Sequence, residues 1–326
     1  MQRFKDILCV VGDVTADGHV LERAVTLAGN NQASLTVVEV VDRVTAGIGM
    51  PEGGPISADL QTALVSAHEA GLETLVNSYR ARIGIQTRVL VGVSFLEIIR
   101  EVLRNRHDLV IKSPENRDWL DRLFGSEDMH LLRKCPCPVW LIKPGKRKSY
   151  RRILAAVDAG DAYPEEELAS RRALRRQIVE MASSLALSEF AELHVAHAWD
   201  AVAEGAMRGA FMYTPEEKIV AYVEEERRYH ATSLDGLMRE VTGDLGQDAL
   251  DYLKPQTYLV KGDARKEIPL LAKQIGADLI VMGTVARTGI PGFIMGNTAE
   301  SILNQIDCSV LAVKPPGFAT PVTLTG

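Results

Sequence analysis

An internal repeat is the feature that most constrains the fold of this chain, because two similar halves imply two copies of one domain. Asp108–Ile111 reads Asp-Leu-Val-Ile, and Asp278–Val281 reads Asp-Leu-Ile-Val. Cys137–Pro144 corresponds in the same way to Cys308–Pro315, since both segments place an apolar run between a cysteine and a Lys-Pro pair. The repeat therefore predicts the same fold twice, in series.

The boundary between the copies is expected in a short basic stretch. Apolar runs at residues 7–11 and 153–157 open the two copies, and a polar segment that begins with Pro144 and Gly145 precedes the second run. A length of 326 residues also suits two domains of roughly 150 residues each. We expect domains over residues 1–144 and 151–316, a linker over 145–150 and a tail over 317–326.

Short apolar runs alternate with longer stretches of helical period in each copy. The runs are rich in Val, Ile and Leu without strict alternation, which is typical of strands buried on both faces of a parallel sheet. We expect strands at 6–11, 34–41, 87–91, 109–112 and 139–142, and again at 152–157, 191–198, 256–260, 278–282 and 310–313. With helices between them, the pattern predicts an α/β fold of two tandem doubly wound parallel five-stranded sheets.

The expected helices of the first copy lie at 20–28, 57–83, 96–104 and 126–134. Ser94, with Glu97 three residues on, predicts a capped start for the third of them. In the second copy, a helix over residues 215–240 is expected to expose its acidic and basic run at 224–228. In such a sheet a ligand binds beyond the carboxyl ends of the strands, here between the first and fourth strands of each copy.

Composition and charge exclude several classes of protein. Hydrophobic residues make up 46% and charged residues 25% of the chain, as in an ordinary globular protein. The first 148 residues carry 19 basic and 18 acidic side chains and the rest carry 18 and 25, so neither half has the basic surface of a nucleic-acid-binding domain. No apolar stretch is long enough to span a bilayer and no signal peptide is recognisable. We therefore expect a cytoplasmic protein without membrane or nucleic-acid partners.

Four cysteines are too few for a disulfide framework in a chain of this length. Cys135 and Cys137 are separated by a single proline, which is closer than the spacing of a usual zinc knuckle. Reduced thiols are the favoured interpretation, and a metal or redox role for the pair is the alternative. His194 and His197 are three residues apart on an expected strand, so they point to opposite faces and make a poor metal pair.

Two further patterns allow a plain structural interpretation. The arginines of residues 171–176 follow Glu165–Glu167, which favours salt pairing on a solvated helix. The segments 46–51 and 207–213 combine glycines with apolar side chains after a second strand, and either line an apolar pocket or fold back as surface loops; we favour surface loops.

A glycine-rich loop follows the fourth strand of the second copy. It runs from Gly283 to Glu300, contains four glycines and leads into a helix. Glycine lets the backbone approach a ligand closely, and the free N–H groups at a helix start favour an anion. The loop suits a phosphate site, although a glycine-rich turn without a ligand would look the same.

This loop resembles the nucleotide loop of the universal stress protein family, whose pattern is glycine, two residues, glycine, nine residues, glycine, then serine or threonine. Gly283 and Gly296 match the outer glycines, whereas Ala286 and Asn297 depart from the pattern. The resemblance covers nearly the whole chain, once in each copy. It extends to the E-type tandem members through residues 130–136, Gly289, 296–300 and the tail at 320–322.

The resemblance implies a site for ATP or AMP in the second copy, where an aspartate that closes the first strand contacts the adenine side. The implied binding residues are Asp158, Gly283, Arg287, Gly296, Asn297 and Thr298. The first copy has Gly12 and Asp13 at the aspartate position, and its fourth strand is followed by an acidic loop with Glu115, Asp118 and Asp121. Because carboxylates repel a phosphate, the first copy is not expected to bind nucleotide.

The family likeness further implies a stress-response protein without enzymatic activity, with neither catalytic residues nor a metal site. An adenine-nucleotide sensor or slow ATPase acting through the second copy is the alternative, and an adenylyl transferase is a third reading that no catalytic constellation supports. In this family the fifth strands pair domains together. We expect strands 139–142 and 310–313 to pair within one chain, and assembly into a homo-oligomer stays open.

Overall fold

The computed structural model describes residues 4–12, 18–44, 55–114, 127–144, 149–209, 214–243, 245–284 and 295–324. The elements of the first half are β1 (Asp6–Val11), α1 (Gly18–Asn31), β2 (Ser34–Val41), α2 (Pro55–Asn77), β3 (Ile85–Val91), α3 (Ser94–Asn105), β4 (Leu109–Lys112), α4 (Glu127–Lys134) and β5 (Val139–Leu141). Those of the second half are β6 (Arg152–Ala156), α5 (Glu165–Glu189), β7 (Glu192–Trp199), α6 (Glu204–Arg208), α7 (Glu216–Gly243), α8 (Gln247–Leu253), β8 (Gln256–Lys261), α9 (Ala264–Ile275), β9 (Leu279–Gly283), α10 (Asn297–Leu303) and β10 (Ser309–Val313).

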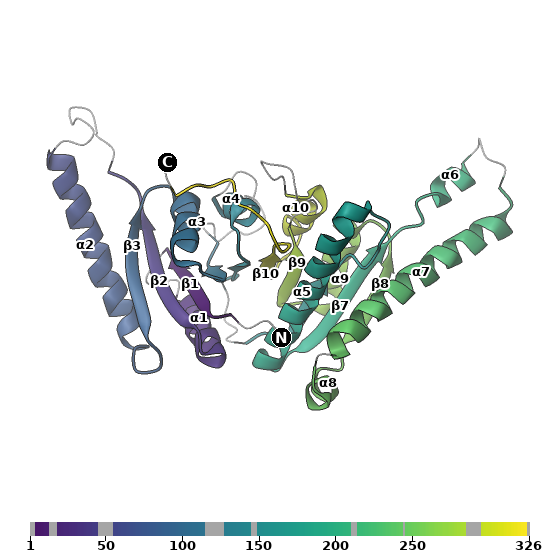
Figure 1. Cartoon of the computed structure of the whole chain (residues 1–326), viewed down its shortest axis with the longest axis horizontal. Coiled ribbons are helices and arrows are strands. Elements are labelled where there is room, and N and C mark those ends of the chain that lie inside the picture. The colour runs from purple at the N-terminus through teal and green to yellow at the C-terminus, as the bar shows by residue number, and fades with distance from the viewer. Residues whose placement is uncertain are drawn as a thin grey trace.

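All ten of these strands form one sheet, in the order β3-β2-β1-β4-β5-β10-β9-β6-β7-β8. Neighbouring strands are parallel within each half, and strand order reverses between β1 and β4 and between β6 and β9, as predicted. The two fifth strands meet antiparallel, with Trp140 opposite Leu311. The two predicted five-stranded sheets are thus joined edge to edge, with α2 beside one outer strand and α7 beside the other (Figure 1).

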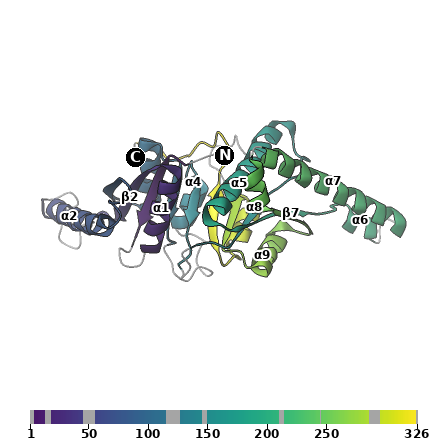
Figure 2. The same ribbon diagram turned by 90° about the horizontal axis from the view of Figure 1, so that it is seen from below.

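Helices cover both faces of the sheet. Alternate strand residues such as Ile7 and Leu8 enter different apolar clusters, because successive side chains of a strand point to opposite faces. One cluster contains residues of α1, α2, α5, α7 and α8, and the other contains residues of α3, α4, α9 and α10. Each cluster draws on both halves of the chain, so the halves share two cores. The view from below shows the resulting elongated molecule, with α2 and α6 at opposite ends (Figure 2).

The repeated Asp-Leu motif has the same structural role in each half. Asp108 accepts hydrogen bonds from the backbone N–H groups of Lys5, at 2.7 Å, and Asp6, at 3.1 Å. Asp278 accepts from the N–H groups of Arg151, at 2.8 Å, and Arg152, at 3.1 Å. Each aspartate therefore satisfies the free donors at the start of its neighbouring first strand, which explains why this residue type recurs at the same place.

Aromatic and charged side chains close one face of the junction between the halves. Trp140 of β5 is fully buried, and its ring lies 5.8 Å from that of Tyr150. The guanidinium of Arg23 on α1 lies 3.9 Å from the centre of the Tyr150 ring and forms an ion pair with Glu189 on α5. Glu189 also accepts a hydrogen bond from the Tyr150 N–H at 3.1 Å. Residues from both halves and from the segment between them thus form one contact network.

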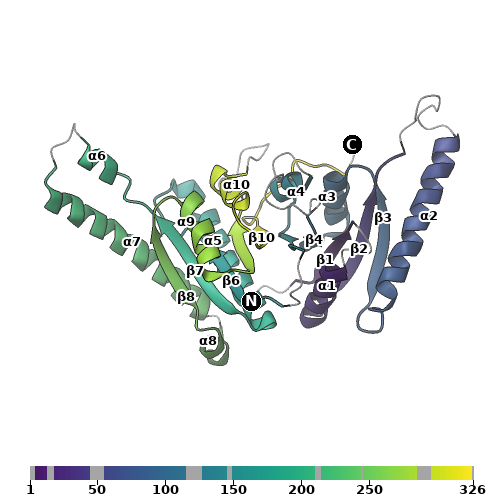
Figure 3. The same cartoon turned by 180° about the vertical axis from the view of Figure 1, so that it is seen from behind.

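On the other face, α4 and α10 flank the junction (Figures 1 and 3). Arg133 of α4 forms an ion pair with Glu300 of α10 at 2.8 Å. The tail beyond β10 then crosses to the first half, where the carbonyl of Thr323 accepts a hydrogen bond from Arg100 of α3 at 3.2 Å. The C-terminal residues therefore help to hold the halves together.

The structure corrects the predicted helix cap. Ser94 is the first residue of α3, not its N-cap, and the N-cap position belongs to Val93 without a side-chain hydrogen bond. Glu97 instead pairs with Arg100 at 2.6 Å. The second half also contains two helices, α6 and α8, that the alternating pattern did not predict. None of the helices in the described ranges combines the length and apolar character that a membrane crossing requires.

We predict that Arg23→Ala lowers the free energy of unfolding by about 3 kcal/mol, because it leaves the carboxylate of Glu189 largely buried without its partner. The side chains of this pair are only 7% and 15% exposed. The matched control is Arg82→Ala, which removes a pair with Glu22 whose side chains are 48% and 44% exposed and which should cost about 1 kcal/mol or less. Urea unfolding of both variants measures the difference, and equal losses would contradict the assigned role of Arg23.

Candidate functional site

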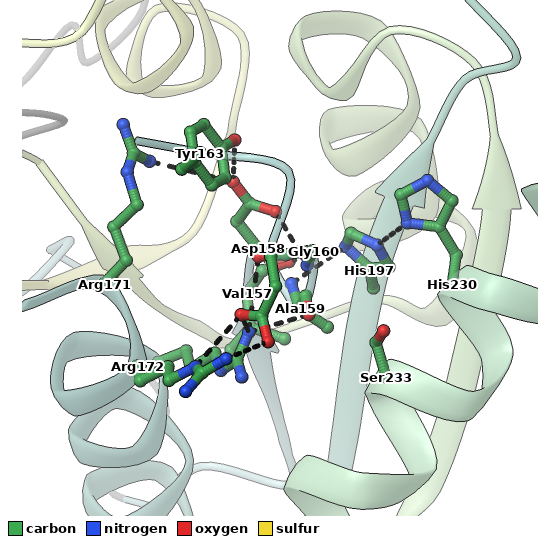
Figure 4. A network of polar contacts seen from close by, with 12 residues as sticks. Val157, Asp158, Ala159, Gly160, Tyr163, Arg171, Arg172, His197, His230 and Ser233 are labelled. Carbon is green, nitrogen blue, oxygen red and sulfur yellow. Dashed lines mark hydrogen bonds and ion pairs between the residues drawn. The ribbon is translucent and has the colours of Figure 1, made fainter. Parts of the chain in front are cut away.

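A cluster of polar side chains, linked by hydrogen bonds and ion pairs, lies at the carboxyl end of β6, beside the reversal of strand order (Figure 4). The chain leaves β6 through Val157 and Asp158, and α5 and α7 bring further polar groups to the same place. A loop at this position has neighbouring strands on both sides but no crossover above it, which is why ligands of doubly wound sheets bind there.

Asp158 is the central carboxylate of this cluster. Its Oδ1 accepts a hydrogen bond from the Gly160 N–H at 3.2 Å, and its Oδ2 accepts one from the Tyr163 hydroxyl. Burial, followed by the charge of Asp158 and this hydrogen bond, raises the pKa of Tyr163 to about 12. The Arg171 guanidinium stacks 3.6 Å from the Tyr163 ring centre and lies 3.9 Å from the carboxylate. The Asp158 side chain remains 50% exposed, so it can still accept a hydrogen bond from a ligand.

Two arginines of α5 hold the loop that carries Asp158. Arg175 donates to the carbonyl of Ala159 at 2.7 Å and to Asp161 at 3.0 Å, and Arg172 pairs with Asp161 at 2.7 Å. Hydrogen bonding from Arg172 is the main reason why the pKa of Asp161 lies below its usual value. The predicted pairing within the helix is correct for Arg171, which contacts Glu167 at 2.8 Å. It is wrong for Arg172 and Arg175, whose partner comes from the loop.

A pair of histidines lies behind the loop. His197 of β7 is 2% exposed, and its Nε2 lies 2.8 Å from Nδ1 of His230 on α7. Nδ1 of His197 lies 3.2 Å from the backbone N of Ala159 and 3.3 Å from the carbonyl oxygen of Val157, both at the end of β6. The loop, the strand and the helix are therefore linked by one chain of hydrogen bonds.

Desolvation is the main reason why the pKa values of His197 and His230 are both lowered. His230 also packs between the rings of Trp199, at 5.7 Å, and Tyr229, at 5.1 Å. The sequence did not reveal this pair, because the two residues are 33 positions apart and on different elements. His194 faces elsewhere and contacts the Tyr258 hydroxyl at 3.0 Å, as the strand period predicted. Among the described residues, no three potential metal ligands of the His, Cys, Asp and Glu types lie close enough to hold an ion.

The glycine positions named from the sequence lie at the same end of the sheet. Gly283 is the last residue of β9, and a Cβ atom there would lie 2.9 Å from Cδ2 of Leu174 on α5. Gly296 is the N-cap residue of α10, and its N–H donates to the carbonyl of Thr284 at 3.1 Å. Asn297 and Thr298 are exposed in the first turn of that helix. The space at Gly283 is thus used for close packing of α5 on β9.

Some of the predicted features lie outside the described residues. These are Ala286, Arg287 and Gly289, Asp13, the whole segment 46–51, residues 210–213, the acidic loop of the first half and residues 145–148 of the expected linker. The part of segment 207–213 that the structure describes ends α6, a helix without buried residues.

The first half has a different arrangement at its corresponding strand end. Lys112 closes β4 and is 6% exposed, and its Nζ lies 2.6 Å from Oδ1 of Asp128 on α4. A buried ion pair therefore stands beside the position where the second half has Gly283. Replacing either partner of such a pair is strongly destabilising, because it leaves the other charge buried without a counter-charge.

The fold and the site together define a class: two doubly wound α/β domains in one chain, joined through their last strands, with a cluster of polar side chains at the strand-order reversal of the second half. A family model described as "Universal stress protein family" matches residues 3–143 and 149–314. The chain belongs to the universal stress protein family.

Individual relatives are similar to this chain over almost its full length. Universal stress protein E of Escherichia coli (strain K12) is 28% identical and covers 99% of this chain and 98% of its own length. The Universal stress protein E homolog of Haemophilus influenzae is 27% identical, with coverage of 96% and 98%. A solved universal stress protein from Pseudomonas aeruginosa UCBPP-PA14 is similar with a TM-score of 0.69 and 26% identity, over 96% of this chain and 94% of that one. The resemblance to the E-type tandem members is confirmed.

We predict that the histidine pair makes the protein less stable in acid. The native pKa values of His197 and His230 lie below the ordinary 6.5, so the unfolded chain binds their protons first. The stabilisation is then fully present above pH 6.5 and is lost as the pH falls through the native values. Urea unfolding over a pH series should show a weaker acid loss in the double variant His197→Gln/His230→Gln than in the unmodified protein.

The control for this series is His68→Gln, since His68 contacts Glu39 at 2.9 Å far from this cluster and is 33% exposed at its side chain. If the free energy of unfolding depends on pH in the same way for the double variant and the unmodified protein, the pair does not take up protons on unfolding and the prediction is wrong.

Proposed function

We propose that this chain is a non-enzymatic, cytoplasmic stress-response protein built from two fused universal-stress domains. The domains correspond to residues 1–144 and 151–316, with a linker at 145–150 and a tail at 317–326. The observation that carries the proposal is the antiparallel pairing of β5 with β10. This contact replaces the association of two separate domains, so the chain supplies the complete paired architecture by itself.

The contacts within the cluster of polar side chains support the absence of catalysis. Catalysis by a nucleophile needs a base within hydrogen-bond reach and a place for the reacting atom beside both. The described polar groups are instead engaged with one another: Asp158 with Tyr163, Asp161 with two arginines, and His197 with a backbone N–H and His230. They hold the loop and leave no described nucleophile–base pair directed at the open side of Asp158.

This proposal is tested by deleting the gene in its native host and measuring survival under starvation and oxidant exposure. We expect a survival defect that the unmodified gene restores. A variant with Trp140→Asp should not restore survival, because a charge in the fully buried junction disrupts the paired architecture. Leu253→Asp, which places a charge at a buried residue of α8 away from the junction and from the cluster around Asp158, is the control, and survival restored by this variant would show that the loss in Trp140→Asp is specific to the junction. Full survival of the deletion strain would contradict the proposed role.

The second candidate function is adenine-nucleotide binding by the second half alone. The half-exposed carboxylate of Asp158 at the strand-order reversal favours it. The binding set would be Asp158, Gly283, Arg287, Gly296, Asn297 and Thr298, with the phosphates of ATP or AMP near the start of α10. The buried Lys112–Asp128 pair and the acidic loop argue against a second site in the first half.

Calorimetry with ATP tests this candidate. If the second half binds ATP, Asp158→Ala should weaken binding by about tenfold or more, because a hydrogen bond to a charged group is worth about 1.5–3 kcal/mol. Asp13→Ala, at the corresponding place in the first half, should leave binding unchanged. No heat and no shift in melting temperature with the unmodified protein would remove the candidate, and phosphate release above that of buffer would replace it with a slow ATPase.

A further inference from the structure

A pair of thiols lies in the turn between α4 and β5, directly at the junction of the two halves. Cys135 and Cys137 are free and buried, with exposures of 0% and 8%. Their Sγ atoms are 3.6 Å apart and form a hydrogen bond. Both belong to the apolar cluster that α4 and α10 share. The single proline between the cysteines thus keeps the two sulfur atoms adjacent in a site that contains parts of both halves.

A lysine from the second half enters this thiol site. Lys314 follows β10 and is 3% exposed. Its Nζ donates to the carbonyl of Leu132 in the first half and to Oγ1 of Thr284, and the ring of Phe318 lies 5.1 Å away. Among the described residues, no carboxylate lies within ion-pair distance of this Nζ. A buried ammonium without a carboxylate is costly, so a negative charge on a neighbouring group would stabilise it.

The two sulfur atoms are inequivalent. Burial by itself raises the pKa of Cys135, but hydrogen bonds from Cys137 and the charge of Lys314 lower it overall. The hydrogen bond to Cys135, together with burial, raises the pKa of Cys137. Burial lowers the pKa of Lys314 to about 7, and the two thiols act against that shift. The surroundings of the pair therefore favour a thiolate on Cys135 over one on Cys137.

We propose that Cys135 and Cys137, with Lys314 beside them, are a redox-active dithiol that a low-molecular-weight disulfide converts to a Cys135–Cys137 disulfide. The Cys135 thiolate attacks one sulfur of the disulfide RSSR, which forms a mixed disulfide and releases RS⁻. Cys137 then loses its proton and attacks the Cys135 sulfur, which releases the second RS⁻. In total, two protein thiols lose two electrons and two protons, and RSSR is reduced to two RSH.

The chain contains matched controls for this reaction. Cys9 and Cys308 are also buried, at 0% and 5% exposure, and neither forms a disulfide, but burial raises the pKa of Cys308 to about 12. Lys143 occupies the position in the first half that Lys314 occupies in the second, and it forms an ion pair with Asp307. If the thiols reacted only through global unfolding, all four cysteines would be oxidised at one rate.

The experiment incubates the full-length protein with oxidised glutathione, stops the reaction with an alkylating reagent and analyses each cysteine by mass spectrometry. We expect Cys135 and Cys137 to lose alkylation together as one internal disulfide, while Cys9 and Cys308 stay alkylated. Lys314→Met should slow the oxidation by about threefold or more, because loss of the positive charge raises the pKa of Cys135 and the smaller thiolate fraction outweighs the gain in nucleophilicity. Lys143→Met should leave the rate unchanged.

Oxidation of all four cysteines at one rate would overturn the proposal, as would a glutathione adduct that never resolves to the internal disulfide. An unchanged rate in Lys314→Met would overturn the role of the lysine. The comparison among the four cysteines uses the unmodified protein, so it gives a result even if a variant fails to fold.

Discussion

The antiparallel contact between β5 and β10 is the interaction on which the rest of this structure depends. Each half alone would end in a strand with an unpaired edge, which is an unstable arrangement in water and a site for aggregation. Pairing Val139–Leu141 with residues 310–312 satisfies both edges at once. It also brings α1 against α5 and α4 against α10, so Arg23 can reach Glu189 and Arg133 can reach Glu300. The universal-stress pair is thereby made permanent within one chain.

The two halves share one backbone fold but carry different side chains at the carboxyl ends of their strands. Asp108 and Asp278 anchor the first strands identically, because the geometry of the sheet demands an acceptor there. At the carboxyl ends of the strands no such acceptor is required, and the side chains of the two halves differ there. The first half buries Lys112 against Asp128, whereas the second half presents Asp158 with a half-exposed carboxylate, backed by Tyr163 and two histidines. Among the described residues, the strand end of the first half thus buries its charged pair, and that of the second half leaves a carboxylate half-exposed.

Sequence patterns predicted the fold well and the site in part. The apolar runs located all ten strands to within one residue at each end, except that β3 begins at Ile85, two residues before its expected start, because burial on both faces leaves a strong local signal. Ser94 failed as a cap, since a cap depends on backbone geometry at one residue. The arginines of α5 were assigned to helix neighbours, but Arg172 and Arg175 bind Asp161 from the preceding loop. Such a partner becomes visible only when the loop folds back on the helix.

The sequence by itself determined the repeat, the alternating strands and helices, and the strand ends where a site could form, because these features depend on short-range periodicity and on backbone requirements. Only the tertiary structure decided which side chains meet. His197 and His230 come from a strand and a helix, and Cys135 and Lys314 come from different halves of the chain. Their proximity depends on crossovers and on the β5–β10 contact, and no pattern within one segment encodes a distance between segments.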